Sequence, residues 1–133
     1  MIAIVCVSDD YGMMFNNRRQ SSDEELRKYI INRIGTAKLY MNRYSRKQFE
    51  DYDNIVVSEA FLEDAKKNDY CFVEENNLSA FQGKLDKIII CKWNRAYPSD
   101  VRLSVPLDRY KLVSTTEIKG KSHEKITIEE WSR

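Results

Sequence analysis

Residues 2–7 read Ile-Ala-Ile-Val-Cys-Val, and residues 86–93 read Asp-Lys-Ile-Ile-Ile-Cys-Lys-Trp. Each run is short, almost continuously apolar and rich in β-branched side chains. In residues 2–7 this pattern is typical of a central strand that is buried on both faces, rather than one with a solvent-exposed side. Residues 86–93 give the strongest strand signal in the chain.

A helix is predicted to open at residues 21–25 and to end near Gly35. Ser22 and Glu25 have the spacing of a capping box, and acidic side chains gather at the positive end of the predicted helix. Glycine is a favourable residue just past a helix end. The apolar residues that recur at helical spacing are Leu26, Tyr29, Ile30 and Ile34.

The rest of the chain alternates between strand and helix patterns and then ends in strands. We read residues 13–20 as a long exposed loop, because they have no clean period. Further strands are predicted at 37–41, 54–58 and 70–73, and helices or helical turns at 43–49, 59–67 and 78–85. The alternating runs 110–118 and 125–131, joined by Lys119-Gly120-Lys121-Ser122, predict a C-terminal hairpin. The class is α/β, with a mixed, mostly parallel sheet and flanking helices.

Length and composition indicate one globular domain. The chain has 133 residues and is 42% hydrophobic, with 4 Gly and 2 Pro, which excludes collagen, long coiled coils and wholesale disorder. The net charge of +1 argues against a protein that coats nucleic acid, so no such partner is expected. Residues 16–48 nevertheless carry a local charge of +6 and residues 49–86 one of −7. These segments either complement each other within the fold or offer a basic surface to an anion.

The cysteines and the single histidine define no metal site. Cys6, Cys71 and Cys91 each lie in an apolar run without the spacing of a zinc motif, which indicates buried, reduced thiols. His123 is the only histidine, and its place at the start of the last strand favours a structural role. The apolar run at residues 2–7 is too short to span a membrane and lacks the flanks of a signal peptide. We therefore expect a cytoplasmic protein with no membrane association.

The order of these elements, together with the residues they carry, resembles dihydrofolate reductase. Residues 2–7 with Tyr11-Gly12 are similar to the first strand of that family and its turn into the active-site loop. The other similar segments are Glu24-Glu25-Leu26 with Tyr29, Leu39-Tyr40-Met41-Asn42-Arg43-Tyr44-Ser45, Asn54-Ile55-Val56-Val57-Ser58, and residues 97–100, 110–114 and 123–133. The resemblance implies a single dihydrofolate-reductase-like domain over residues 1–133, with a shortened cofactor-binding half at about residues 36–84.

The resemblance also implies a set of site residues. Glu25 corresponds to the family's carboxylate that contacts the pterin, although the capping box gives it a purely structural alternative. Arg43 and Ser45 correspond to residues that hold the phosphates of NADPH, and the alternative for them is a solvated basic face. The residues that would line the pterin site are Val5, Cys6, Tyr29 and Cys91.

Several positions depart from the family pattern. Asn42 stands where the family has glycine, and Arg18-Arg19-Gln20 stands where it has Leu-Pro-Trp. Glu74-Glu75 replaces a Gly-Gly pair that lies beside the cofactor pyrophosphate, so two carboxylates would face the phosphates in place of amide donors. The family's next tyrosine corresponds to Leu78, and Cys91 replaces a threonine that supports the pterin-binding carboxylate.

Two hypotheses about function follow. The first is an oxidoreductase that transfers hydride from NADPH to dihydrofolate or a related pterin, with Glu25 as the substrate carboxylate. The second is a non-catalytic binding or regulatory protein on the same fold, which has lost dinucleotide binding. In that case the segment with Arg18 and Arg19 would engage a different anionic ligand or a protein partner.

Overall fold

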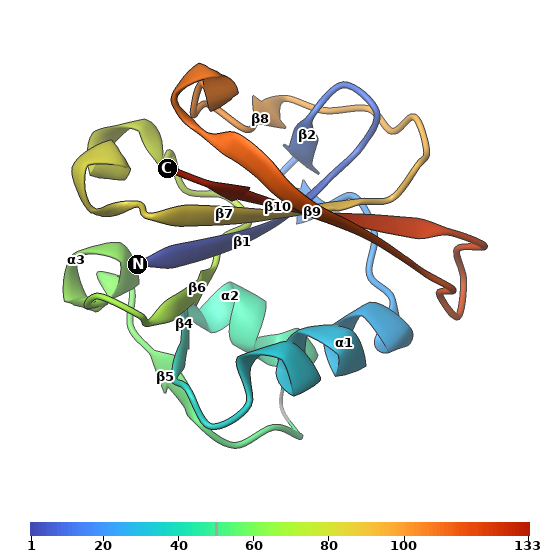
Figure 1. Cartoon of the computed structure of the whole chain (residues 1–133). Coiled ribbons are helices and arrows are strands. Elements are labelled where there is room, and N and C mark those ends of the chain that lie inside the picture. The colour runs from blue at the N-terminus through green and yellow to red at the C-terminus, as the bar shows by residue number, and fades with distance from the viewer. Residues whose placement is uncertain (50) are drawn as a thin grey trace.

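The computed structural model describes residues 1–49 and 51–133, which form strands and short helices in an α/β arrangement (Figure 1). The strands are β1 (Ile2–Val7), β2 (Gly12–Phe15), β3 (Arg18–Arg19), β4 (Leu39–Met41), β5 (Ile55–Val57), β6 (Tyr70–Phe72), β7 (Lys87–Lys92), β8 (Val101–Arg102), β9 (Lys111–Ile118) and β10 (Ile126–Ser132). The helices are α1 (Glu24–Ile34), α2 (Arg43–Arg46) and α3 (Phe61–Asp64), with 3₁₀ turns η1 (Lys47–Phe49), η2 (Ser79–Lys84) and η3 (Leu107–Arg109).

The main sheet has seven strands in the order β5-β4-β6-β1-β7-β10-β9. The pairs from β5 to β7 are parallel, and β10 pairs antiparallel with both β7 and β9. A second sheet of three short strands has the order β3-β2-β8. The predicted α/β class, with a mostly parallel sheet and a C-terminal hairpin, is confirmed.

Alternate residues of the central strands pack into two separate cores, because successive side chains of a strand point to opposite faces. Ile4 and Ile89 pack with α1 on one face of the sheet. Val5 and Ile90 pack on the other face with α3 and the second sheet. In Figure 1, α1 and α2 lie below the sheet, while β2 and β8 lie above it. The prediction that residues 2–7 form a central strand buried on both faces is therefore correct, and β7 is buried in the same way.

The start of α1 differs from the predicted capping box. Asp23 is the residue that caps the helix, and its carboxylate accepts a hydrogen bond from the N–H of Glu25 at 2.9 Å. Ser22, the predicted cap, is exposed. Asp23 takes this role because its carboxylate also receives backbone donors from the distant β9–β10 turn, a contact that local spacing does not contain. Gly35 ends the helix as predicted.

Residues 13–20 are also different from the prediction, because they form most of a β-hairpin and not a loop. β2 and β3 pair antiparallel, with Phe15 opposite Arg18. Asn16 and Asn17 form the connecting turn, with φ values of 55° and 62°. Left-handed residues at both turn positions favour the twist of a two-residue hairpin, and asparagine tolerates this conformation. The Asn-Asn pair was therefore the sequence signal for the hairpin.

Two further observations bear on the expectations from the sequence. Cys6, Cys71 and Cys91 are free thiols, and the last two are buried. Among the described residues, no helix has the length and apolar content needed to cross a bilayer.

Candidate functional site

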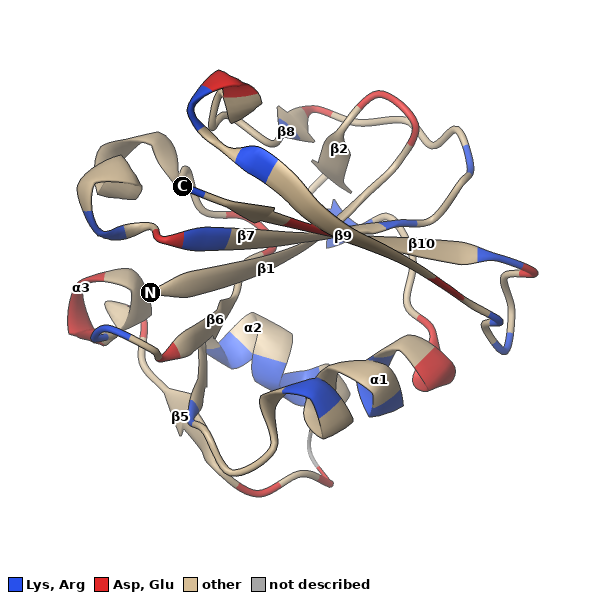
Figure 2. Ribbon diagram, in the orientation of Figure 1, with Lys and Arg blue, Asp and Glu red and all other residues tan. Residues whose placement is uncertain are grey.

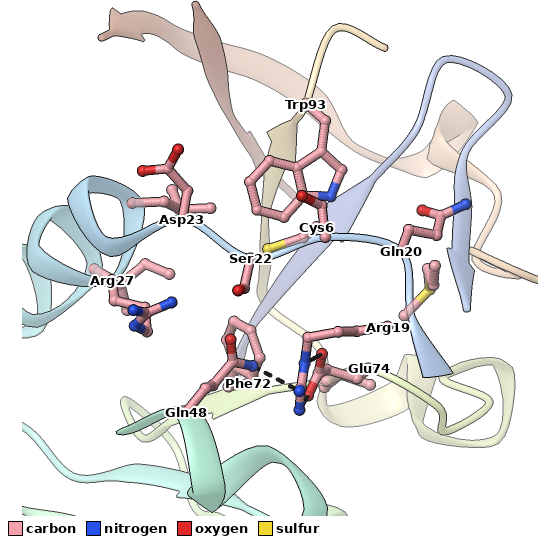
Figure 3. A pocket seen from close by; sticks show the side chains of 15 residues that line it. Cys6, Arg19, Gln20, Ser22, Asp23, Arg27, Gln48, Phe72, Glu74 and Trp93 are labelled. Atoms are coloured by element: carbon pink, nitrogen blue, oxygen red, sulfur yellow. Dashed lines mark hydrogen bonds and ion pairs between the residues drawn. The ribbon is translucent and has the colours of Figure 1, made fainter. Parts of the chain in front are cut away.

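A narrow cleft lies between α1, the end of β6 and the β2–β3 hairpin (Figure 3). Its walls combine apolar side chains from the sheet with polar ones from the hairpin and the helix. The residues that line it are Cys6, Met13, Arg19, Gln20, Ser21, Ser22, Asp23, Leu26, Arg27, Ile30, Gln48, Phe72, Val73, Glu74 and Trp93. The space that a water-sized sphere can enter is only about 10 Å³, which is room for about one water molecule.

Glu74 fills one end of this cleft and is the centre of a hydrogen-bond network. Its Oε2 accepts from Arg19 Nε at 2.9 Å, and its Oε1 accepts from Arg19 Nη2 at 3.1 Å. Ser45 Oγ and Gln48 Nε2 also donate to Oε1, at 2.8 and 3.2 Å. The carboxylate is 8% exposed, so the pair is a largely buried, bidentate ion pair. We call these four residues the Glu74 network.

The Glu74 network also explains how the opposite charges of the sequence are used. Arg19 comes from the basic segment of the chain and Glu74 from the acidic one, and they are 55 residues apart. The guanidinium of Arg19 also lies 4.3 Å from the centre of the Tyr44 ring. Figure 2 shows basic residues on α1 and α2, which lie on the same side of the sheet. At this contact, the two charged segments therefore complement each other within the fold.

The residues expected at the pterin site lie in different surroundings. Cys6 lines the cleft, and its register partner on β7 is Cys91, which is fully buried. The interaction with the Cys91 thiol and burial both raise the pKa of the Cys6 thiol well above its usual value. Val5 is fully buried in the core on the opposite face of the sheet. Of these three residues, only Cys6 lines the cleft.

Glu25 and Tyr29 lie outside the cleft. The side chain of Glu25 is 46% exposed and pairs with Lys28 at 3.4 Å. Glu25 and Tyr29 line a shallow depression beside Ile118 instead. Successive residues of a helix are about 100° apart around its axis, so the face that reaches the cleft carries Leu26 and its neighbours one turn along. That face of α1 presents no carboxylate beyond the capping residue Asp23.

The two residues expected at the cofactor phosphates are separated as well. Ser45 is 1% exposed, and its hydroxyl is committed to Glu74. Arg43 is exposed, and its backbone N–H donates to Glu59 at 3.0 Å. Asn42 caps α2 through Ser45 N and donates its side-chain amide to Glu75 at 2.9 Å. Every peptide bond of the described residues is trans, including the one between Glu74 and Glu75.

A wider groove lies beside the β2–β3 hairpin and shares Arg19 and Gln20 with the cleft. It has a volume of about 520 Å³ and is lined by Phe15, Asn16, Arg18, Arg19, Gln20, Tyr97 and Pro98. Phe15 is 45% exposed, although it is a large apolar side chain. Arg18 is exposed, and the described residues place no carboxylate within ion-pair distance of it. We call this space the hairpin groove.

Asp23 is the centre of a second buried network, close to the first. Lys121 N and Ser122 N each donate to its carboxylate at 2.9 Å, and His123 Nδ1 lies 3.0 Å from Oδ2. Burial opposes the charge of Asp23, but these donors outweigh it and hold the pKa of Asp23 well below its usual range. A Cβ on Gly120 would lie 2.6 Å from this carboxylate, so only glycine allows the turn to approach.

Comparison with known proteins identifies the architecture. The structure matches a dihydrofolate reductase from Enterococcus faecalis, complexed with NADP(H) and RAB-propyl, at a TM-score of 0.68. The match covers 99% of this chain and 95% of that one, with 12% sequence identity. This chain has the dihydrofolate-reductase-like fold. No protein-family model matches the sequence, and a search of curated proteins finds no match. The similarity is therefore one of fold.

Three features of the site were not predicted from the sequence. Arg19 and Glu74 were recognised as departures from the family pattern, but not as side chains that pair with each other. Asp23 was treated as one of several acidic residues at a helix start, and His123 as an isolated structural residue. The contacts Arg19–Glu74 and Asp23–His123 join residues 55 and 100 positions apart, and no local spacing encodes such pairs.

Proposed function

We propose that this chain is a ligand-binding protein of the dihydrofolate-reductase-like fold, which takes a planar, anionic ligand in the hairpin groove and does not reduce dihydrofolate with NADPH. The observation that carries this proposal is the Glu74 network. It puts a carboxylate where the family resemblance would require donors for the cofactor pyrophosphate.

The Glu74 network opposes dinucleotide binding in two ways. A phosphate near Glu74 would meet a negative charge, while Arg19 and Ser45, which could have held it, already bond Glu74. Moving Glu74 aside would leave a partly buried arginine without its partner, which costs about 3–5 kcal/mol when the pair is buried. The residues present therefore do not fit the pyrophosphate of NADPH.

The size of the cleft and its chemistry agree with this interpretation. Ligand pockets usually have volumes of about 300–1,000 Å³, whereas the cleft admits only about one water molecule. The two carboxylates that line the cleft, Asp23 and Glu74, already accept hydrogen bonds from other groups of the fold. A pterin would therefore lack both room and a carboxylate free to bind it.

The hairpin groove has the properties that the cleft lacks. Its volume of about 520 Å³ lies within the usual range for ligand pockets. The exposed ring of Phe15 and the ring of Tyr97 offer surfaces on which a planar group can stack. Arg18 supplies a positive charge that is available to a carboxylate or phosphate. These features together favour a planar ligand that carries a negative charge.

The reductase is the second candidate, because the similar solved structure is a dihydrofolate reductase complexed with NADP(H). That candidate requires the Glu74 network to open when the cofactor binds. It predicts NADPH binding in the micromolar range and turnover of dihydrofolate that is lost in Glu25→Gln.

The proposal is tested by titrating the protein with 1-naphthyl phosphate, using 1-naphthol as the uncharged control, and following tryptophan fluorescence or heat. We expect the phosphate to bind and the naphthol to bind at least about tenfold more weakly, since one charge-assisted contact contributes about 1.4 kcal/mol or more. Arg18→Ala should remove this difference. Arg109→Ala, which changes an exposed arginine outside the groove, should preserve it.

Two results would contradict the proposal. One is equal binding of the charged and uncharged compounds. The other is a preference for the phosphate that survives in Arg18→Ala.

A further inference from the structure

The strongest unexplained feature is the environment of His123. This residue is 3% exposed, and its ring stacks on Trp93 with 4.6 Å between the ring centres. Asp23 Oδ2 lies 3.0 Å from Nδ1. On the other side of the ring, Ser21 Oγ lies 3.1 Å from Nε2 and the Tyr97 hydroxyl lies 3.2 Å from it. Both ring nitrogens therefore have polar partners, although the ring is buried.

The partners of the ring determine where its proton lies. The carboxylate of Asp23 can only accept hydrogen bonds when it is ionised, and its donors keep it ionised. Nδ1 of His123 therefore carries a proton and donates it to Asp23. In the neutral ring, Nε2 is then left with a lone pair, which accepts a hydrogen bond from a hydroxyl. Ser21 Oγ is within the distance required for such a bond.

This arrangement has the geometry of an activated serine. In catalytic triads, a carboxylate orients the histidine through Nδ1–H, and Nε2 removes the proton from the serine hydroxyl. Here Asp23, His123 and Ser21 occupy those places in that order, with both contacts near 3 Å. The stacked Trp93 ring prevents the imidazole from turning away. The nearby thiol of Cys6 is no competing nucleophile, because its raised pKa keeps it protonated.

The two residues whose hydroxyls lie at Nε2 are both partly exposed. Ser21 is half-buried and lines the cleft beside Ser22. Tyr97 lines the hairpin groove with its ring, while its hydroxyl touches His123. Gln20, the residue before Ser21, lines both spaces. A ligand in the hairpin groove therefore approaches the edge of His123 that carries Nε2.

We propose that Ser21, His123 and Asp23 form a catalytic triad that hydrolyses carboxylic esters whose acid or alcohol part carries an anionic, planar group. The substrate preference rests on the proposed function, since the hairpin groove and Arg18 would hold that group. The triad itself stands on the contacts of His123 and is tested independently of the groove.

The reaction proceeds in two balanced steps. Ser21 Oγ attacks the ester carbonyl carbon while His123 Nε2 takes the hydroxyl proton, and Asp23 stabilises the imidazolium. The bond between the carbonyl carbon and the alcohol oxygen then breaks, and His123 returns the proton to the departing alcohol. A water molecule attacks the acyl-serine in the same way, which releases the acid and restores the serine hydroxyl. While Ser21 bonds Nε2, the Tyr97 hydroxyl is available to donate to the oxyanion.

The direct test is covalent labelling of the intact protein with a fluorophosphonate, followed by peptide mass mapping. We expect one adduct, on Ser21, and none at that position in Ser21→Ala. Ser22→Ala is the matched control, because Ser22 also lines the cleft and lies next in the chain but has no hydrogen bond to His123. Its labelling should equal that of the unmodified protein. A folded protein that gains no adduct on Ser21 would overturn the proposal.

The role of the histidine is tested by rate. His123→Gln should slow labelling at Ser21 by about 100-fold or more, as expected when a general base is removed. Because His123 is buried, this variant could fail to fold. Asp23→Asn, which removes the carboxylate that orients His123, is therefore measured as a second variant, and both variants are first checked for folding by urea denaturation. A folded variant of either kind that is labelled at the unmodified rate would exclude His123 as the base.

Hydrolysis of 4-nitrophenyl acetate separates this proposal from the proposed function. A burst of about one nitrophenolate per chain, lost in Ser21→Ala, supports the triad even if 1-naphthyl phosphate does not bind. If 1-naphthyl phosphate binds and depends on Arg18, but neither labelling nor a burst is seen, the proposed function stands and the triad is rejected.

Discussion

The cleft contains two buried carboxylates that do opposite things. Glu74 accepts hydrogen bonds from Arg19 and Ser45, which leaves these donors committed to the fold and not to a ligand. Asp23 also accepts several bonds from its own fold, yet it holds a histidine whose second nitrogen meets Ser21 and Tyr97. A buried carboxylate such as Glu74 prevents ligand binding when it occupies the donors that a ligand would need. A buried carboxylate such as Asp23 supports a site when it orients a side chain that a ligand can contact.

The largest effect is expected from breaking the closed network. Glu74→Ala removes the acceptor of Arg19, Ser45 and Gln48, and leaves their donors buried or half-buried without a partner. The free energy of unfolding should fall by about 2–4 kcal/mol, measured by urea denaturation. Glu75→Ala, at the exposed neighbouring position, removes a single hydrogen bond from Asn42 and should lower it by about 1 kcal/mol. Equal losses in the two variants would show that the network contributes little.

The second effect concerns acid stability and the Asp23 network. The pKa of Asp23 is lowered in the folded state, so its contribution to stability is complete above its ordinary pKa of about 4 and is lost as the pH falls below that value. Asp23→Asn should lower stability by about 1–3 kcal/mol at neutral pH and by progressively less toward pH 2. Urea denaturation across this pH range checks it. A difference that stays constant with pH would show that Asp23 is not ionised in the fold.

A smaller effect on stability is expected at the β2–β3 hairpin, which lines both the cleft and the hairpin groove. Asn17 has a φ of 62°, a left-handed conformation that costs most residues about 1–2 kcal/mol. Asn17→Ala should therefore destabilise the protein by about 1 kcal/mol, whereas Asn17→Gly should change stability by only a few tenths. Thermal melting of both variants checks this. If Asn17→Ala and Asn17→Gly had the same melting temperature, residue 17 would not have the left-handed conformation described.

The smallest effect is expected at Glu25. Its side chain is exposed and pairs only with Lys28, so Glu25→Gln should change stability by less than about 0.5 kcal/mol. Binding of 1-naphthyl phosphate should be unchanged, because Glu25 does not line the hairpin groove. Isothermal titration of the variant checks this. A loss of 1-naphthyl phosphate binding in Glu25→Gln would support a role of Glu25 in ligand binding, as the family resemblance implies, and would contradict its place outside the ligand site.

The fold could be predicted from the sequence to the extent that it depends on local patterns. The run at residues 2–7 predicted a central strand and the run at residues 86–93 predicted a strand, because short apolar runs rich in β-branched residues are typical of buried strands. The alternating runs at the C-terminus likewise specified the β9–β10 pair. The hairpin at residues 12–19 was missed, because each of its strands is too short to show a period.

The site could be predicted only in part. The sequence singled out Arg19 and Glu74 as departures from the family, but their partnership depends on the folding of segments 55 residues apart. The position at which α1 begins determines whether Glu25 or Leu26 faces the cleft. The capping-box spacing predicted Ser22 as the cap, whereas Asp23 caps the helix, so the spacing did not predict which residue faces the cleft. The contact between Asp23 and His123 depends on a turn that only glycine permits.

The central claim is that the cleft is closed to a nicotinamide dinucleotide, and the most direct test is the melting temperature of the unmodified protein in millimolar NADPH. A cofactor at about 100 times its dissociation constant stabilises a protein by about 2.7 kcal/mol, which would raise the melting temperature by more than about 5 °C. We predict no shift. A shift of that size, accompanied by reduction of dihydrofolate, would contradict the account.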